Sequence, residues 1–167
     1  MASGGAVGAF HNITAEKSAQ DELALLSLVA SATDNMVLIT DDLGRLEWAN
    51  PAFEERTGYR FDEVQGRTPG SFLQGPDTDK SETARIAAAV RHGLSCQADL
   101  LNYTKSGEPF WTTLQITPIR NASGQLERFI SVQSDSTGLH QTQLELQTAK
   151  RRAEAANTAK STFLATV

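Results

Sequence analysis

The chain of 167 residues has little cysteine, little clustered positive charge and no long apolar run, and each shortage excludes a class of protein. Its single cysteine, Cys96, cannot form an internal disulfide, which is typical of proteins from the reducing cytoplasm. Its formal net charge is −5 and its longest basic run is Lys150-Arg151-Arg152, so it lacks the basic face that nucleic-acid binding requires. No apolar stretch approaches the roughly 18 residues of a membrane span, and no signal-peptide pattern opens the chain. The sequence therefore predicts a cytoplasmic protein that neither binds nucleic acid nor inserts into a membrane.

Catalytic and metal-binding patterns are absent from the sequence as well. The histidines His11, His92 and His140 are far apart and have no partners at metal-ligand spacing. The sequence contains neither the GxxxxGK[ST] loop of nucleotide-binding proteins nor the GxSxG turn of serine hydrolases. We therefore predict that this chain is not an enzyme and holds no catalytic or metal site.

The composition changes along the chain and divides it into four segments. Residues 1–14 are small and Gly-rich, as in a terminal tail or the end of a preceding segment. Residues 15–33 predict a connector helix whose wide apolar stripe needs a partner. Residues 34–136 have the pattern of one folded domain, and residues 137–167 predict a long helix without proline.

The central segment, residues 34–136, alternates short apolar runs with turn residues. A hairpin around an Asp/Gly turn opens it, and three longer strands separated by Gly-containing turns close it. The expected strands are residues 36–40, 45–48, 94–103, 110–119 and 127–135, and the expected helices are residues 52–57, 61–64 and 81–92. This order predicts an α+β domain, with a five-stranded antiparallel sheet and short helices packed on one face.

Between these helices, residues 66–79 contain three Gly and two Pro among small polar residues, so they predict a short turn or helical bracket. Its two bulky apolar residues, Phe72 and Leu73, are expected to anchor it on the core. Such a bracket can wall one side of a cavity, or it can be an ordered surface loop with two anchors. Thr78 or Asp79 is expected to cap the following helix, as Asn50 caps residues 52–57.

Three polar residues, Asn102, Thr112 and Gln133, fall at inward positions of the expected strands. A buried polar side chain needs hydrogen-bond partners. Those partners are either neighbouring side chains and water, or a bound molecule, and the pattern alone leaves both interpretations open.

The last segment carries a weak heptad seam. One position is occupied by Leu139, Leu146, Ala153 and Lys160, and the other by Thr142, Ala149, Ala156 and Phe163. Such a helix is marginal when isolated in water. We therefore expect a homodimer, formed through a C-terminal coiled coil, through the N-terminal helix, or through both.

Several motifs between residues 34 and 136 together resemble a PAS domain. Its first half is carried by Asp41-Asp42-Leu43-Gly44, Trp48-Ala49-Asn50-Pro51-Ala52-Phe53, Thr57-Gly58-Tyr59 and Glu63-Val64-Gln65-Gly66-Arg67. Its second half is carried by Leu101-Asn102-Tyr103-Thr104-Lys105-Ser106-Gly107, Pro109-Phe110-Trp111, Thr117-Pro118-Ile119 and Phe129-Ile130-Ser131-Val132-Gln133.

Within that family, the run of residues 72–79 is most similar to the flavin-binding LOV branch. That branch has an Asn-Cys-Arg run before the Phe-Leu-Gln, and its Cys forms a light-driven bond to flavin. Here Pro69-Gly70-Ser71 stands in that place, so Gly70 occupies the position of the reactive Cys. Cys96 lies on a later strand and does not match that position.

The resemblance also implies which residues would contact a flavin. Asn102, Gln133 and Gln74 match ring contacts of the branch, while Thr112 stands at its second Asn and Ala87 at its phosphate-binding Arg. Trp111 and Leu114 complete the expected site. The phosphate-binding Arg and the Arg of the Asn-Cys-Arg run are both absent here, so two charge-assisted contacts to a flavin are missing. We therefore expect a domain without cofactor first, with bound FMN or FAD as the alternative.

The two ends of the chain resemble parts of a sensor kinase. Residues 10–14 resemble the end of a preceding PAS domain, and residues 159–167 resemble the segment just before the phosphoacceptor His of bacterial sensor histidine kinases. The leading hypothesis is a sensory and dimerisation PAS module that signals through Gln133, Asp135 and Thr137 to the last helix and a downstream kinase domain. The alternatives are a flavin photo- or redox sensor without a cysteinyl bond, and an interaction domain without ligand.

Overall fold

The computed structural model describes residues 14–18, 20–21, 25 and 28–166. Its helices and strands confirm the expected order within one to two residues at most ends. In chain order they are β1 Met36–Asp41, β2 Leu46–Ala49, α2 Pro51–Thr57, α3 Phe61–Val64, α4 Gly70–Leu73, α5 Lys80–Arg91, β3 Cys96–Tyr103, β4 Pro109–Arg120, β5 Leu126–Asp135 and α6 Thr137–Ala165.

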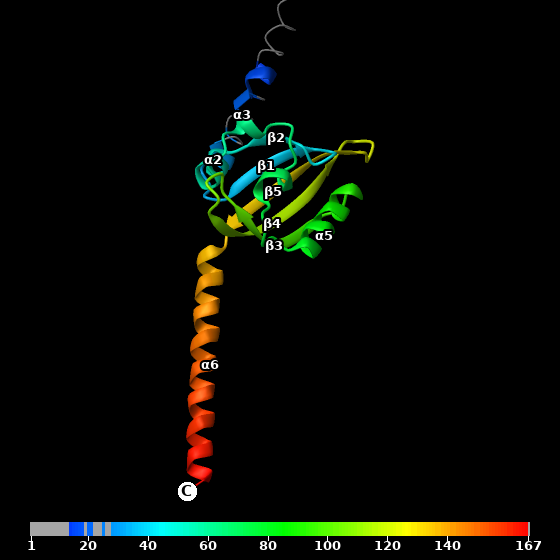
Figure 1. Cartoon of the computed structure of the whole chain (residues 1–167). Helices are drawn as coiled ribbons and strands as arrows, with labels where there is room; N and C mark the ends of the chain where they lie inside the picture. The colour runs from blue at the N-terminus through cyan, green and yellow to red at the C-terminus, as the bar shows by residue number, and fades with distance from the viewer. Residues whose placement is uncertain (1–13, 19, 22–24, 26–27, 167) are drawn as a thin grey trace, which may run out of the picture.

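The five strands form one antiparallel sheet in the order β2-β1-β5-β4-β3 (Figure 1). The last strand in the sequence, β5, therefore lies at the centre, between β1 and β4. A displacement of β5 would therefore act on its hydrogen-bonded neighbours β1 and β4. The same strand leads directly into α6.

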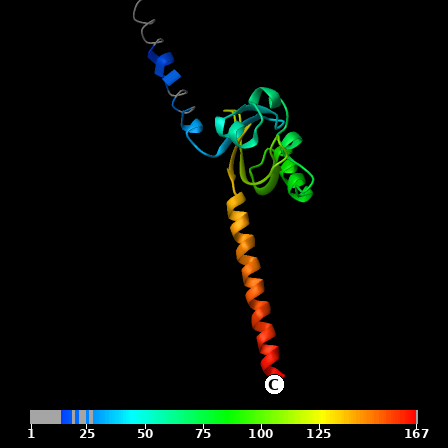
Figure 2. The same cartoon turned by 60° about the vertical axis from the view of Figure 1, so that its left-hand side comes forward.

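The helices α2 to α5 lie on one side of the sheet (Figure 2). Alternate strand residues point toward them, as the two-residue period of a strand requires. The inward set is buried in all four longer strands, and includes Met36 and Leu38 on β1, Leu100 and Asn102 on β3, Phe110 and Thr112 on β4, and Phe129 and Gln133 on β5. The α+β class with helices on one face is thus confirmed.

Local capping explains where α2 and α5 begin. The fully buried Asn50 accepts hydrogen bonds from the backbone N–H groups of Phe53 and Val37, and donates to the carbonyls of Ala30 and Asn35. This one side chain therefore starts α2 and also holds the end of the N-terminal helix. Asp79, rather than Thr78, caps α5 by accepting from the N–H groups of its first turn.

Most of the buried apolar residues that the structure describes fall into two clusters. The larger cluster joins α2, α3 and α4 to β1, β2 and the start of β4, and includes Phe53, Phe72 and Phe110. The smaller one consists of Ala98, Leu100 and Leu114 on β3 and β4. The gap between the two clusters is where the candidate site lies.

The helices at the two ends of the chain point away from the domain in opposite directions (Figures 1 and 2). Along α6 the apolar side chains stay exposed, with Leu139 at 68% and Leu146 at 69%. The expected N-terminal helix is helical at residues 14–18, 20–21, 25 and 28–31, while residues 10–13, Leu23 and Leu26 lie outside the described residues. In the described part of the chain, no helix is long and apolar enough to cross a membrane.

Candidate functional site

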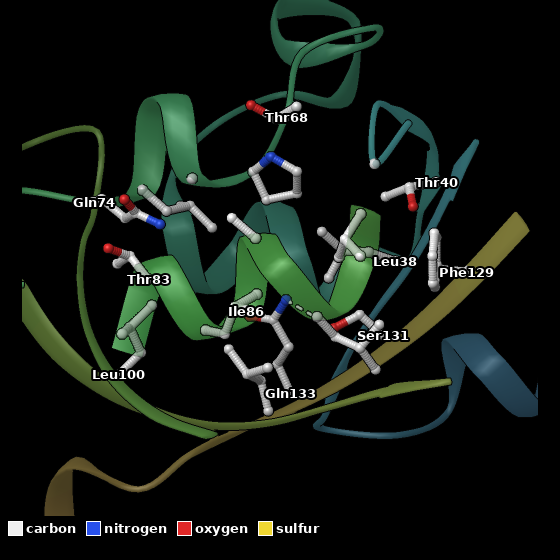
Figure 3. Close-up of a pocket in the computed structure, with 18 of the residues that line it drawn as sticks. Leu38, Thr40, Thr68, Gln74, Thr83, Ile86, Leu100, Phe129, Ser131 and Gln133 are labelled. Atoms are coloured by element: carbon white, nitrogen blue, oxygen red, sulfur yellow. Dashed lines mark hydrogen bonds between the residues drawn. The ribbon is translucent and has the colours of Figure 1, made fainter. Parts of the chain in front are cut away.

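A cavity of about 600 Å³ lies between the inner face of the sheet, the α4 bracket and α5. Its walls include Leu38 and Leu73 from the larger apolar cluster and Leu100 and Leu114 from the smaller one. The two clusters are therefore separated by this space. Figure 3 shows side chains from the sheet, the bracket and α5 converging on it.

The sheet side of the cavity presents two buried amide side chains. Asn102 on β3 is 3% exposed and donates from Nδ2 to Thr112 Oγ1 at 3.3 Å. Gln133 on β5 is 5% exposed and donates from Nε2 to Ser131 Oγ at 3.2 Å. Each amide can make about four hydrogen bonds. In the described part of the chain each side chain makes one, so both have donors and acceptors left for another partner.

The bracket supplies a third amide, Gln74, just after α4. A Cβ placed on Gly70 would lie 2.5 Å from Gln74 Nε2, so the absence of a side chain at Gly70 gives this amide its room. The bracket itself is held down by Thr78, which accepts from Gly75 N–H and donates to the Leu101 carbonyl at 2.7 Å. Phe72 and Leu73 are buried beside it, as expected from the sequence.

Helix α5 covers the cavity without being buried itself. None of its residues is buried, and its inward positions Ile86, Ala87 and Val90 all line the cavity. A helix with an apolar stripe usually packs that stripe against a core. Here Ile86 packs against the smaller apolar cluster, but the stripe also faces the cavity, so filling this space would complete the packing of α5.

The structure brings together four of the six residues expected to contact a ligand. Asn102, Gln133, Gln74 and Leu114 line the cavity. Thr112 is fully buried as the hydrogen-bond partner of Asn102, and does not itself line the cavity.

Trp111 does not line the cavity, so the expectation that it contacts a ligand there is corrected. It follows Phe110 on β4, and Phe110 is fully buried on the inner face, so the pleat turns Trp111 to the outer face. There its ring stacks on His140 of α6, with centroids 4.1 Å apart and planes 16° from parallel.

Sequence analysis missed several polar side chains of the cavity, among them Ser131, Thr83 and Thr40. Ser131 and Thr40 could have been found, because each lies two residues from an inward residue on the same strand. Thr83 is on α5, where the helical period alone does not separate a cavity wall from an exposed face.

Hydrogen bonds and an ion pair with α2, β4 and α6 itself hold the corner between β5 and α6. Asp135 accepts from the backbone N–H of Thr137 at 2.8 Å and pairs with Arg56 of α2. Burial acts to raise the pKa of Asp135, but the hydrogen bonds of Thr137 and the charge of Arg56 outweigh it and lower this pKa below its usual value. On the outer face, Thr137 Oγ1 accepts from the backbone N–H of Trp111 at 2.9 Å. The backbone N–H of Ser136 donates to the Trp111 carbonyl, also at 2.9 Å.

Cys96 is buried on β3 outside the cavity lining, and its Sγ lies 3.3 Å from the guanidinium of Arg85. It therefore does not take the place of a cavity thiol. In the part of the chain that the structure describes, no group of three His, Cys, Asp or Glu side chains is arranged to hold a metal ion.

The antiparallel sheet has the order β2-β1-β5-β4-β3, its cavity lies under short helices, and α6 follows β5 directly. This arrangement agrees with one protein family. Residues 34–138, more than half of the chain, match the PAS domain. The chain belongs to the PAS domain family. As such it is a sensory module and not a catalytic one.

The curated proteins similar to this PAS domain include blue-light-activated histidine kinases. The domain is 47% identical over 90 residues to a blue-light-activated histidine kinase of Brucella ovis, a match that covers 54% of this chain and 18% of that protein. The corresponding protein of Brucella anthropi is 46% identical over the same length. The chain thus spans less than a fifth of these curated relatives.

A solved structure supports the same fold. The PAS domain superimposes on an RNA-binding Light-Oxygen-Voltage receptor with a TM-score of 0.69 and 29% sequence identity. That match covers 77% of this chain and 37% of the receptor. The predicted LOV-like PAS fold is therefore confirmed.

Proposed function

We propose that this PAS domain is a flavin-binding sensor of a histidine kinase and that it passes the state of its cavity to α6. The observation that carries the proposal is the cavity of about 600 Å³ that separates the two apolar clusters and is edged by amides. Ligand pockets commonly have this size, with mostly apolar walls and a few polar groups that orient the ligand. The similarity to blue-light-activated histidine kinases supports flavin as the ligand class.

The residues present fit the ring of a flavin. Asn102, Gln133 and Gln74 each offer a donor and an acceptor, as the polar edge of a flavin ring requires. Leu38, Leu100 and Leu114 offer apolar surface to its faces. A bound flavin would supply blue-light absorption and reversible electron uptake, while the protein residues orient the ring and keep water from it.

The path to α6 begins at Gln133. A change in the hydrogen bonding of its amide would act on β5, which ends two residues later at Asp135. Asp135 and Thr137 hold the start of α6 against α2 and β4. Because packed elements move between discrete arrangements, a small shift of β5 is able to reposition this long helix.

The remaining features of the proposed parent follow from its relatives. We infer a cytoplasmic histidine kinase in which α6 leads to the kinase domain and pairs with the α6 of a second copy. The similarity of residues 159–167 to the segment before a phosphoacceptor His supports this order of domains.

The deciding experiment for the ligand is an absorbance spectrum of the purified chain, with mass spectrometry of the supernatant after denaturation. We expect a flavin band in the blue, either as purified or after addition of riboflavin or FMN. Because Gly70 offers no sulfur, blue light without a reductant should not bleach this band reversibly. A colourless protein that takes up no added flavin would refute the proposal.

The deciding experiment for signalling is the Gln133→Leu substitution in the full-length kinase. Leu keeps the size of the side chain but loses the donor to Ser131 Oγ and the amide that faces the cavity. We expect light or redox control of autophosphorylation to be lost while the basal rate remains. Unchanged basal and stimulated rates would remove Gln133 from the path.

A further inference from the structure

Among the described residues that line the cavity, the charged side chains are Lys80 and Arg91, and both are exposed at its mouth. We propose that the site selects the uncharged ring system of a flavin and not its phosphate, so that riboflavin binds at least as tightly as FMN. This inference rests on the proposed flavin site and adds its ligand class.

The lining itself carries the first argument. In the part of the chain that the structure describes, only Lys80 and Arg91 of the lining residues are charged, and they stand at the two ends of α5. Both side chains are exposed, so either cation alone would add little to the binding of a phosphate, because water and salt screen its charge. The cavity-facing positions between them are small or apolar, namely Thr83, Ala84, Ile86, Ala87 and Val90.

A second argument comes from the N-terminus of α5. Free N–H groups at a helix start can bind a phosphate. Here Asp79 already accepts from the N–H groups of Ser81 and Glu82, at 2.7 and 3.3 Å. Its carboxylate would also repel a phosphate at this place, so the helix end is closed to an anion.

The remaining guanidinium of α5 is engaged elsewhere. Arg85 pairs with Glu82 at 2.7 Å and donates to the Gln97 carbonyl at 2.6 Å, outside the cavity. A phosphate moved from water into the cavity would lose its hydrogen bonds to water and gain no hydrogen-bonded cation, which costs free energy. The ring loses much less, because it gains apolar contact and the three amides.

The test compares riboflavin and FMN on the purified chain, with the dissociation constant measured by quenching of flavin fluorescence at about 150 mM salt, where exposed charges are screened. We expect the dissociation constant of FMN to be equal to or larger than that of riboflavin, which means that FMN binds no more tightly. FMN binding ten-fold tighter than riboflavin would overturn the inference and leave the flavin site intact. If neither flavin binds, the proposed function itself fails.

A substitution makes the same test from the opposite direction. Ala87 lines the cavity midway along α5, so Ala87→Arg places a cation where none stands. One charge-assisted contact should tighten FMN binding about ten-fold and leave riboflavin unchanged. Ala87→Gln is the control of similar length without charge, and should change neither ligand relative to the other. Equal effects of Arg and Gln on FMN would contradict the inference.

Two further variants test the cations at the mouth. Lys80→Ala and Arg91→Ala should change FMN and riboflavin affinity by the same factor, because neither side chain is assigned a phosphate. A selective loss of FMN affinity of about ten-fold in either variant would show that the mouth holds the phosphate, and would overturn the inference.

Discussion

At the residue scale, two glycines of the bracket differ in what a methyl group would meet. A Cβ on Gly75 would lie 2.3 Å from ring carbons of Tyr103, whose hydroxyl is held by Asp77. A Cβ on Gly70 would meet only the end of the Gln74 side chain, which can turn away. We expect Gly75→Ala to destabilise the fold by about 1–3 kcal/mol and Gly70→Ala by less than about 1 kcal/mol.

Urea unfolding of both variants measures this difference through the midpoint at constant slope. Gly70→Ala serves as the matched control, since both changes add one methyl group to the same bracket. Equal midpoints for the two variants would show that Tyr103 yields to the methyl group. Gly70→Ala should in addition weaken flavin binding, because it displaces the Gln74 amide.

The Asp135 carboxyl predicts a pH dependence. Its pKa is lowered in the folded protein, so the folded state favours the ionised form more than the unfolded state does. The resulting stability is fully present above the unfolded pKa, about 3.9, and is lost as the pH falls through the lower folded value. Asp135→Asn should therefore reduce the urea midpoint at pH 7, and the difference from the unmodified protein should shrink as the pH falls below about 4.

A matched substitution checks that the effect comes from the pair with Arg56. Glu108 lies 4.0 Å from the same guanidinium but is 67% exposed, so Glu108→Gln should leave the midpoint nearly unchanged at both pH values. If Asp135→Asn were equally destabilising at pH 3 and pH 7, the carboxyl charge would have no part in holding the corner.

Several site residues were predictable because their signal is local. The cap at Asn50 follows from Asn-Pro before a helical run, and the inward places of Asn102 and Gln133 follow from strand alternation. The pair of Arg56 with Asp135 is different, because it joins α2 to the end of β5 across 79 positions. Nothing local in either segment marks the other as its partner.

At the element scale, the outer face of β4 anchors the first turns of α6. Trp111 donates to Thr137, accepts from Ser136 and stacks on His140, while it stays clear of the cavity. We expect Trp111→Leu to keep the fold and flavin binding and to loosen the start of α6. Faster hydrogen exchange of residues 137–147, with unchanged exchange in β3, would be the signature.

Trp48→Leu is the control, because it removes the other tryptophan from β2, at the far edge of the sheet. It should leave the exchange of α6 unchanged. Protection of α6 that is the same in the Trp111→Leu variant and the unmodified protein would mean that the backbone bonds alone hold the helix.

The elements also show where sequence patterns stop being informative. The three-strand meander β3-β4-β5 follows from turns between neighbouring strands, and it was predicted. The pairing of β1 with β5 joins the two ends of the domain, and the sequence analysis did not predict it. Helix α5 has the pattern of a core helix, yet it faces a cavity, because a period of 3.6 residues does not tell a packed neighbour from a ligand.

At the scale of the whole molecule, the seam of α6 leaves large apolar side chains exposed in the described structure. A 29-residue helix leaves the domain with Leu139, Leu146 and Phe163 each more than two thirds exposed. A second copy would bury these residues in a coiled coil, and a helix of this kind is marginal without such a partner. The proposed signal depends on this pairing, because a shift at the corner needs a second helix against which to register.

We therefore expect Leu146→Glu to shift the chain from dimer toward monomer, because it places a charge in the apolar seam at one heptad position. Thr148→Glu is the matched control, since it adds the same charge two residues away, off the seam. Sedimentation velocity at several concentrations measures both, together with a chain that ends at residue 138. If Leu146→Glu and Thr148→Glu sediment alike as dimers, while the shortened chain is also dimeric, the sheet or the N-terminal helix forms the interface. The signal from Gln133 would then have to reach the kinase by a route other than the α6 seam.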